Sequence, residues 1–412
     1  MNTLFDLRVR KESAWIEAVR KTIGEPLDVV SFDERSINAC MGCWDCWLRT
    51  PGRCVMNDPM SRSYPAYMSS NRIVLLMDTA QGFISHRSKA FMDRTIPHYH
   101  AYIAIVDGEC RHAARYSRYP DLVFVFDKRG LSDREDELIE AYLARSAAHY
   151  RSKAYRLDPD GGGGLRLLKP ARVPERSEAG DPAGSMERLV IYNGSPRRKN
   201  SNSGLILDRV VNALGDRVEI RDLKKREHWD RWAEGFSSES HVLFFMPLYV
   251  HAMPSHVMAF MERLPASEGT ISFFVQSGFP ESSQSHYLEA YAGLLARRLG
   301  RTYLGTAIRG GVESLQMRPP EGRDAMMAPM VGAIVRLADE GRFHPEDLER
   351  LARPVRFGRT TALLAGLLFR LGTNRFIWGP RLKQNNAFAA RSDRPYAPRK
   401  GFAGQPADEW RG

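Results

Sequence analysis

Four of the five cysteines lie within fifteen residues of one another: Cys40, Cys43, Cys46 and Cys54. Two residues separate each of the first three, and this spacing lets one short loop direct three thiolates at an iron–sulfur cube, with a fourth from nearby chain. The pattern therefore predicts a [4Fe–4S] centre. Zinc is one alternative, although zinc ribbons use two such pairs far apart, and reduced thiols or a redox-active pair are another. Cys110 stands alone, which is typical of a buried apolar residue.

A second stretch that could do chemistry is NGSPRRKNSNS, residues 193–203. It follows an apolar run at 188–192, typical of a buried strand, and precedes residues 204–214, which have helical periodicity. Small residues between a strand and a helix let backbone N–H groups approach a phosphate, and the helix N-terminus adds positive partial charge. The stretch therefore predicts an anion site. A plain surface turn capped by Ser201 or Ser203 is the alternative.

Two further apolar runs end in loops of aromatic and small polar residues. Residues 243–246 lead into PLYVHAMP (247–254) and a predicted helix, and residues 271–275 lead into QSGFPE (276–281). In an open parallel sheet, the loops at the carboxyl ends of neighbouring strands converge on one crevice. One loop for a phosphate and two with aromatic residues suit flavin mononucleotide (FMN).

The run NGSPRRKNSNS, then PLYVHAMPSHVMAFMER, then QSGFPE resembles the NADPH-dependent FMN reductases of the flavodoxin-like fold, over residues 187–315. The resemblance implies FMN as cofactor, with NADPH or NADH as co-substrate. It implies that the FMN phosphate is held by Ser195, Arg197, Ser201, Asn202 and Ser203. It also implies that the flavin ring is surrounded by Pro247, Leu248, Tyr249 and Met253, with a third wall of Ser277, Gly278 and Phe279.

The cysteine segment carries a second resemblance. Residues 37–60 are similar to the compact cysteine motif of iron–sulfur flavoproteins, which belong to the same broader family. This resemblance implies a [4Fe–4S] cluster bound by Cys40, Cys43, Cys46 and Cys54.

The elements that must position these residues form a repeated alternation of strands and helices. Residues 1–157 and 187–315 each alternate in this way, which predicts an α/β fold with doubly wound parallel sheets. KAFMDR (89–94) matches MAFMER (258–263), and IEAY (139–142) matches LEAY (288–291). We therefore predict two fused copies of one flavodoxin-like domain, each with strand order 2-1-3-4-5, joined by a Gly- and Pro-rich linker at 158–186.

The two copies have lost different features. The first copy begins LFDLRVRKES (4–13), without Gly-Ser-Pro after its strand, and its second loop, DTAQGFIS (78–85), lacks Pro-x-Tyr. The second copy has residues 224–240 where the cysteines would be. One copy is thus expected to hold metal and the other FMN, the two packing as an internal pseudo-dimer.

A mainly helical extension, residues 316–412, follows the second copy, with helices expected at 324–340 and 345–351 and an apolar run at 361–371. It is expected to cover the second domain or a symmetry mate in a homo-oligomer, with a membrane-surface helix as the alternative. Its apolar run at 361–371 is shorter than the roughly 18 residues that a membrane span requires, so no span is expected.

Composition and charge limit the classes of protein to which the chain can belong. Apolar content of 43% and charged content of 26% are typical of a soluble globular protein, and a cytoplasmic location is expected. The net charge of +11 is spread along the chain without a nucleic-acid recognition motif, so no nucleic-acid partner is expected. The predicted function is an FMN-dependent NAD(P)H oxidoreductase that passes electrons to a small-molecule or protein acceptor. A non-catalytic electron-transfer protein or redox sensor is the alternative.

Overall fold

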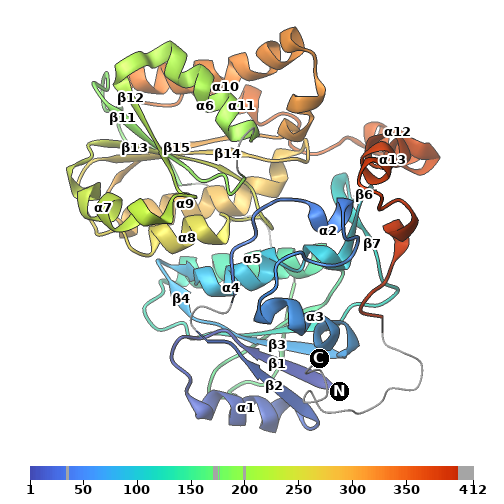
Figure 1. Ribbon diagram of the computed structural model, residues 1–412. Helices are drawn as coiled ribbons and strands as arrows, with labels where there is room; N and C mark the ends of the chain where they lie inside the picture. Colours follow the sequence, from blue (N-terminus) through green and yellow to red (C-terminus); the bar gives the residue numbers. More distant parts are fainter. Residues whose placement is uncertain (34–36, 170–174, 176, 198–200, 398–412) are drawn as a thin grey trace.

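The computed structural model describes residues 1–33, 37–169, 175, 177–197 and 201–397. Within these residues the chain forms two α/β halves, one above the other in Figure 1, each built on a parallel sheet with helices on both faces. None of the helices in this described part is both long enough and apolar enough to cross a membrane.

The first half is organised around a six-stranded sheet. From edge to edge its strands are β10 (Arg166–Leu168), β9 (Ala154–Leu157), β8 (Asp121–Val125), β3 (Arg72–Leu76), β1 (Asn2–Asp6) and β2 (Leu27–Ser31). All neighbouring strands are parallel except β10, which is antiparallel to β9. The helices of this half are α1 (Ser13–Ile23), α3 (Pro59–Ser69), α4 (His86–Asp93) and α5 (Asp133–His149).

The second half has a five-stranded sheet that is parallel throughout. Its strands in spatial order are β12 (Val218–Asp222), β11 (Leu189–Asn193), β13 (His241–Pro247), β14 (Thr270–Gln276) and β15 (Thr302–Arg309). Its helices are α6 (Asn202–Leu214), α7 (Trp229–Glu234), α8 (Ser255–Met261), α9 (His286–Arg298), α10 (Pro320–Glu340) and α11 (Pro345–Leu351). The central strands β11, β13 and β14 are mostly apolar and buried because helices cover both faces of the sheet.

The parallel strands of both sheets follow the same spatial order. Numbered along the chain within each half, β2-β1-β3-β8-β9 and β12-β11-β13-β14-β15 are both arranged 2-1-3-4-5. Each half also has shorter elements. These are α2 (Asp45–Leu48), β4 (Thr79–Ala80), β5 (Phe83–Ile84), β6 (Tyr99–Val106), β7 (Glu109–Ala114), η1 (Ile96–His98), η2 (Gly215–Arg217), η3 (Arg226–His228), η4 (Gly235–Ser238), η5 (Ser282–Ser285) and η6 (Val312–Met317).

Two parts of the chain differ from the sequence prediction. The segment predicted as a plain linker, 158–186, contributes β10 to the first sheet, and its end packs on the second half, where Met186 is buried in the core. The antiparallel hairpin β6–β7 was not predicted. Strand β6, YHAYIAIV, has an apolar run consistent with a strand, but its partner β7, ECRHAA, mixes charged, histidine and small residues and has none.

The two halves pack through matching helices. Helix α4 lies on α8, and α5 lies on α9, between the two sheets (Figure 1). Phe83 stacks on Tyr291 with ring centroids 4.5 Å apart, and the Arg298 guanidinium pairs with Glu135, donating from Nη2 to Oε2 at 2.7 Å. One continuous cluster of buried apolar residues includes side chains of both halves, so the interface has the character of a domain core.

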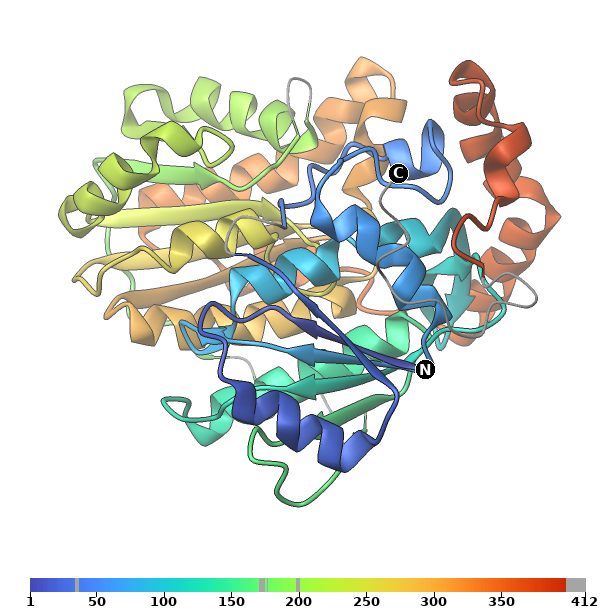
Figure 2. The ribbon, with the colours of Figure 1, turned by 60° about the horizontal axis from the view of Figure 1, so that its bottom comes forward.

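The C-terminal extension divides into two parts. Helices α10 and α11 pack on α6 and β15 and complete the core of the second half. The chain then crosses to the first half, where α12 (Arg359–Leu368), η7 (Phe369–Thr373), α13 (Asn374–Gln384) and η8 (Ala389–Ser392) follow one another. Figure 2 shows this last part, in red, at the edge of the molecule. It contacts the β6–β7 hairpin and α2.

Candidate functional site

Strand register brings the three predicted loops to one end of the second sheet. In the β13–β14 pair, Pro247 lies opposite Gln276, and in the β11–β13 pair, Asn193 lies opposite Phe245. The loops that follow β11, β13 and β14 therefore leave the sheet side by side, as expected at the carboxyl ends of parallel strands.

The loop after β11 is held close to the sheet before it enters α6. The Asn193 side chain accepts from the Ser195 backbone N–H at 3.1 Å and donates to Asp222 at 2.7 Å. A Cβ at Gly194 would lie 2.7 Å from Val257, so only glycine permits this close approach. Residues 198–200 of the predicted phosphate loop lie outside the described residues.

The N-terminus of α6 is capped by Ser201, whose hydroxyl accepts from the Gly204 backbone N–H at 3.0 Å. The Asn202 side chain donates to the Val312 carbonyl at 2.9 Å, so it links this helix to the loop after β15. The Ser203 hydroxyl is hydrogen bonded to the Gln276 amide. These side chains are buried and fix the start of α6, while the N–H groups of its first turn have no partner within the helix.

The loop after β13 makes a strained turn that the first half helps to hold. Val250 and His251 have φ angles of 44° and 59°, values that a β-branched residue such as valine rarely adopts. The Tyr249 carbonyl accepts from the Lys89 ammonium at 2.8 Å, and Lys89 is itself paired with Asp93 on α4. Both of these charged side chains are completely buried. A residue of the first half thus positions the ring-binding loop predicted for the second.

The cysteine loop of the first half lies directly on these loops. The Gly42 carbonyl accepts from Arg197 Nε at 3.0 Å, and the Arg197 guanidinium lies 4.3 Å above the Trp44 ring. A Cβ at Gly42 would lie 2.0 Å from the Tyr249 hydroxyl oxygen. Glycine at position 42, with a φ of 61°, is therefore required both by its backbone conformation and by this contact.

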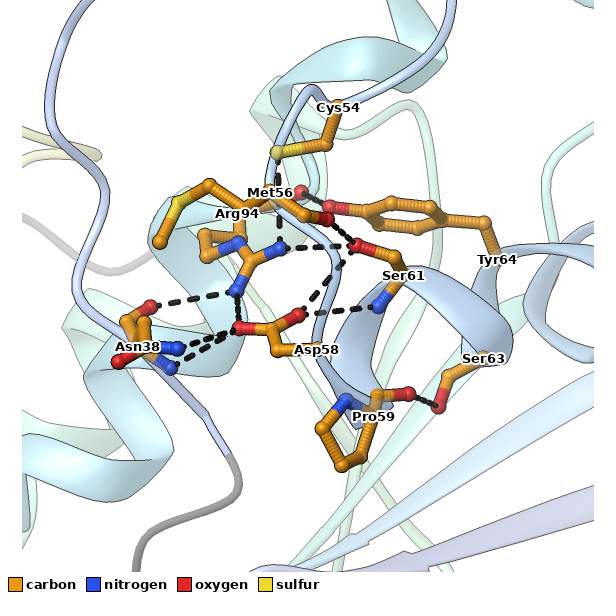
Figure 3. Close-up of polar contacts among 9 residues, drawn as sticks. All are labelled: Asn38, Cys54, Met56, Asp58, Pro59, Ser61, Ser63, Tyr64 and Arg94. Atoms are coloured by element: carbon orange, nitrogen blue, oxygen red, sulfur yellow. Dashed lines mark hydrogen bonds and ion pairs between the residues drawn. The ribbon is translucent and has the colours of Figure 1, made fainter.

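A buried polar network fixes the end of the cysteine loop (Figure 3). The Arg94 guanidinium pairs with the Asp58 carboxylate and donates to the Cys54 sulfur at 3.5 Å. Asp58 also accepts from the Asn38 amide at 3.1 Å, and the Ser61 backbone N–H is a further donor to it at 3.3 Å. Arg94 is only 1% exposed, so removing either partner of this ion pair would leave an unpaired charge in the interior.

The four predicted metal ligands line one cavity, but their arrangement does not support a metal centre. Burial raises the pKa of the Cys40 thiol to about 12, and it also raises the pKa of Cys43 and of Cys46. In the described part of the chain, no group of three or more His, Cys, Asp or Glu side chains is placed to hold a metal ion. The predicted [4Fe–4S] cluster on Cys40, Cys43, Cys46 and Cys54 and its zinc alternative are therefore not supported.

Three histidines that line the same cavity each have a buried nitrogen without a partner in the described part of the chain. Nδ1 of His112, Nδ1 of His149 and Nε2 of His251 have no hydrogen-bond partner among the described residues. The His149 ring lies 5.1 Å from His251, and the His112 ring lies 5.1 Å from Phe279. Burial lowers the pKa of His112 to about 4 and holds those of His149 and His251 well below the ordinary value, so all three imidazoles are neutral at pH 7.

A cavity of about 400 Å³ unites these features. Its lining includes every residue predicted to contact FMN except Met253, which is completely buried in the core. It also includes residues that were not predicted as part of the site, which come from the first half and the extension: Trp47, His112, His149, Trp378 and Arg381. Nothing in their local sequence marks them, since only the packing of the two halves and the tail brings them to the site.

The sequence matches no protein-family model and no curated protein. Among solved structures, an FMN-dependent NADH-azoreductase from Bacillus anthracis in complex with FMN is 14% identical with a TM-score of 0.30; the match covers 37% of this chain and 100% of the azoreductase. A putative quinone reductase from Klebsiella pneumoniae is 10% identical with a TM-score of 0.31, over 43% of this chain and 99% of its own. TM-scores this low carry no argument, so a functional conclusion has to come from the site.

Proposed function

We propose that the chain is an FMN-dependent NAD(P)H oxidoreductase in which the second half binds FMN and the first half covers the flavin. The observation that supports this most strongly is the convergence of the loops after β11, β13 and β14 on a single cavity beside the N-terminus of α6. A cavity of this size, largely apolar with a few fixed polar groups, is typical of a cofactor site. Bound FMN would supply hydride and electron transfer, and the chain would supply binding, orientation and exclusion of water.

In this proposal, the chain's residues have distinct roles toward the flavin. Ser195, Ser201 and Ser203 surround the phosphate together with the N–H groups of the first turn of α6. The Arg197 guanidinium is paired with Glu313 at 3.3 Å and donates to the Gly42 carbonyl, so it ties the cysteine loop to the edge of the site. Leu248, Tyr249 and the wall of Ser277, Gly278 and Phe279 contact the ring.

We further propose that the two halves are fused copies of one flavodoxin-like domain, packed as an internal pseudo-dimer. The shared strand order supports this, and so does the packing of matched elements. The sequence pair KAFMDR and MAFMER lies on α4 and α8, and the pair IEAY and LEAY lies on α5 and α9. Each helix contacts its own counterpart, as the self-complementary surface of a two-fold dimer requires.

We assign His112 and His149 to the electron acceptor. They line the cavity beside Phe279 and His251 of the flavin loops, and their buried Nδ1 atoms have no hydrogen-bond partner among the described residues. Substituting either by Phe should weaken acceptor binding without changing the reduction of FMN by the nicotinamide, because the two half-reactions use different residues. Stopped-flow measurement of each half-reaction separates the two effects.

The central experiment is the anaerobic addition of NADPH, and then separately of NADH, to protein loaded with FMN. We expect rapid loss of the flavin absorbance, faster with NADPH. Absence of bleaching by either nucleotide would instead indicate an electron-transfer protein. Iron analysis of protein purified under argon belongs to the same preparation, and about four irons per chain would reinstate the cluster that the side-chain arrangement does not support.

A further inference from the structure

The last part of the C-terminal extension exposes an unusual amount of apolar side chain. On α12, Leu363 is 76% exposed, Leu364 and Leu368 are each 59% exposed, and Leu367 is 52% exposed. Beyond the helix, Leu371 is 74% and Phe376 is 82% exposed. These six side chains form what we call the leucine face. Single exposed apolar residues are normal on a protein surface, but a contiguous group of this kind indicates an interaction site.

Helical geometry makes the leucine face continuous. Leu363 and Leu367 are four residues apart, as are Leu364 and Leu368, so the two pairs form adjacent rows on the same side of α12. Leu371 extends these rows into η7.

The opposite side of this segment is anchored to the first half. Asn374 exchanges two hydrogen bonds of 2.9 Å with the backbone of Ile103 on β6. Trp378 is buried edge-on against Trp44 and Trp47, with ring centroids 5.6 Å and 5.9 Å away. The segment is thus held in place by one side while its leucine face remains toward solvent.

The stretch of sequence that carries the leucine face has charges of one sign only. Residues 351–392 contain eight basic residues and no aspartate or glutamate: Arg353, Arg356, Arg359, Arg370, Arg375, Arg381, Lys383 and Arg391. Elsewhere the two signs are mixed, since the whole chain has 60 basic and 49 acidic residues. A protein partner for this face would need a hydrophobic surface with an acidic rim, whereas an anionic bilayer surface offers both properties without a specific shape.

We propose that the α12–η7–α13 segment docks the protein on an anionic membrane surface, with the leucine face inserted at the boundary between headgroups and acyl chains. Amphipathic helices with leucine and aromatic residues on one face and arginine around it bind bilayers in this way, without spanning them. The basic residues add attraction to anionic lipids, which salt weakens. Docking would place α13, whose residues Ile377, Trp378 and Arg381 line the site cavity, next to the lipid.

The test is co-sedimentation of the full chain with lipid vesicles. We expect binding to vesicles of equal parts phosphatidylcholine and phosphatidylglycerol, little binding to phosphatidylcholine alone, and release by high salt. The double variant Leu363→Gln/Leu367→Gln should reduce partitioning into anionic vesicles by at least about tenfold, because it removes apolar area from the inserted face. The matched control is Leu167→Gln/Val211→Gln, which changes residues 48% and 38% exposed elsewhere on the surface and should bind as the unmodified chain does.

Circular dichroism and thermal unfolding establish that both double variants fold. The proposal is overturned if the unmodified chain does not bind anionic vesicles, or if the Leu363→Gln/Leu367→Gln variant binds them as well as the unmodified chain does. It is also overturned if the lipid-free chain sediments as a stable dimer that this variant converts to monomer, since a second copy would then cover the leucine face.

Discussion

The two halves share a strand order, yet their first loops have opposite electrostatic character. After β11, the loop leads to Ser195 and to a helix capped by Ser201. After β1, the Arg8 guanidinium folds inward, pairs with Asp6 at 2.9 Å and donates to the Glu12 carbonyl at 3.1 Å. Where the second half leaves helix N–H groups open to an anion, the first half has filled the corresponding place with a neutralised ion pair.

The same exchange of roles appears at the other boundary between the halves. A second cavity is lined by Val9 from the first half's loop and by Arg226 and Trp229 from the segment that replaces the cysteines in the second. Its lining also includes residues 37–39 at the start of the cysteine segment and residues of α4 and α8, so both halves contribute to it. The two halves therefore differ mainly in their loops, while both sheets and the interface between them are retained.

The largest effect should come from breaking the ion pair that closes the first half. Arg8 and Asp6 are 1% and 0% exposed, so Arg8→Ala leaves a buried carboxylate without its partner and should lower the free energy of unfolding by about 3–5 kcal/mol. Urea denaturation measures the change. Arg188→Ala is the matched control, because its pair with Glu219 is 57% and 39% exposed and should be worth less than about 1 kcal/mol. Similar losses for the two variants would contradict this account.

The next largest effect is expected at the loop after β11, which is proposed to bind the FMN phosphate. Ser195 is 4% exposed, so Ser195→Glu would place a carboxylate against the FMN phosphate and should weaken FMN binding at least about a hundredfold, or about 2.8 kcal/mol. Flavin absorbance per chain after gel filtration measures it. Val9→Glu makes the same change in the first half's loop, at a residue 53% exposed, and should leave one FMN per chain. Two flavins per chain, or FMN retained by Ser195→Glu, would refute the assignment of the flavin to the second half alone.

A smaller effect should follow from separating the cysteine loop from Tyr249. Gly42→Ala and Gly24→Ala both place alanine at a positive φ, 61° and 80°, and each should cost about 1 kcal/mol of stability or somewhat more. The variants differ in their surroundings. A Cβ at Gly24 meets nothing within 4 Å, whereas one at Gly42 meets the Tyr249 hydroxyl at 2.0 Å. FMN affinity, measured by titration, should therefore fall only in Gly42→Ala. An equal fall in both variants would show that the contact between the cysteine loop and Tyr249 does not contribute to FMN binding.

Local patterns were sufficient to predict much of this architecture. The apolar runs at 188–192, 243–246 and 271–275 correspond to β11, β13 and β14, because buried parallel strands are continuous apolar runs, whereas β9, β10, β12 and β15 were not predicted. The loops proposed to bind FMN could also be predicted, because glycine, proline and hydroxyl residues after a buried strand are a local pattern. Met253 was the exception, because its place in the core rather than on the cavity depends on how the strained turn at Val250 and His251 directs the following residues.

What the sequence could not provide was the assembly of the site. His112 lies on β7, a strand without an apolar run, and Trp378 lies on a tail helix more than two hundred residues from the cysteines it packs beside. Such contacts depend on how the halves dock. The cysteine spacing predicted a metal centre, yet the backbone that carries Cys40 and Cys43 also has to meet Arg197 and Tyr249, and spacing alone says nothing about that requirement.

The last expected effect is on the pH dependence of unfolding, which depends on buried histidines in both halves. His98 in the first half and His256 in the second are both buried, and burial lowers the pKa of each to about 3. In the unfolded chain a histidine has a pKa near 6.5, so between about pH 6.5 and pH 3 the unfolded state binds a proton that the folded state does not. Stability should therefore fall as the pH falls through this window, by about 1.4 kcal/mol per pH unit for each such histidine.

Replacing one of these histidines shows whether the two halves unfold as one cooperative unit or independently. His98→Phe keeps a ring between Tyr64 and Tyr67, whose centroids lie 5.2 Å and 4.7 Å away, and removes one titrating group. If the shared core makes the halves one cooperative unit, the variant should reduce the acid sensitivity of a single urea transition, and His256→Phe should do the same. Two separate transitions, with His98→Phe affecting only one of them, would show that the halves unfold independently. The interface through α4, α5, α8 and α9 would then be weaker than its continuous apolar packing indicates.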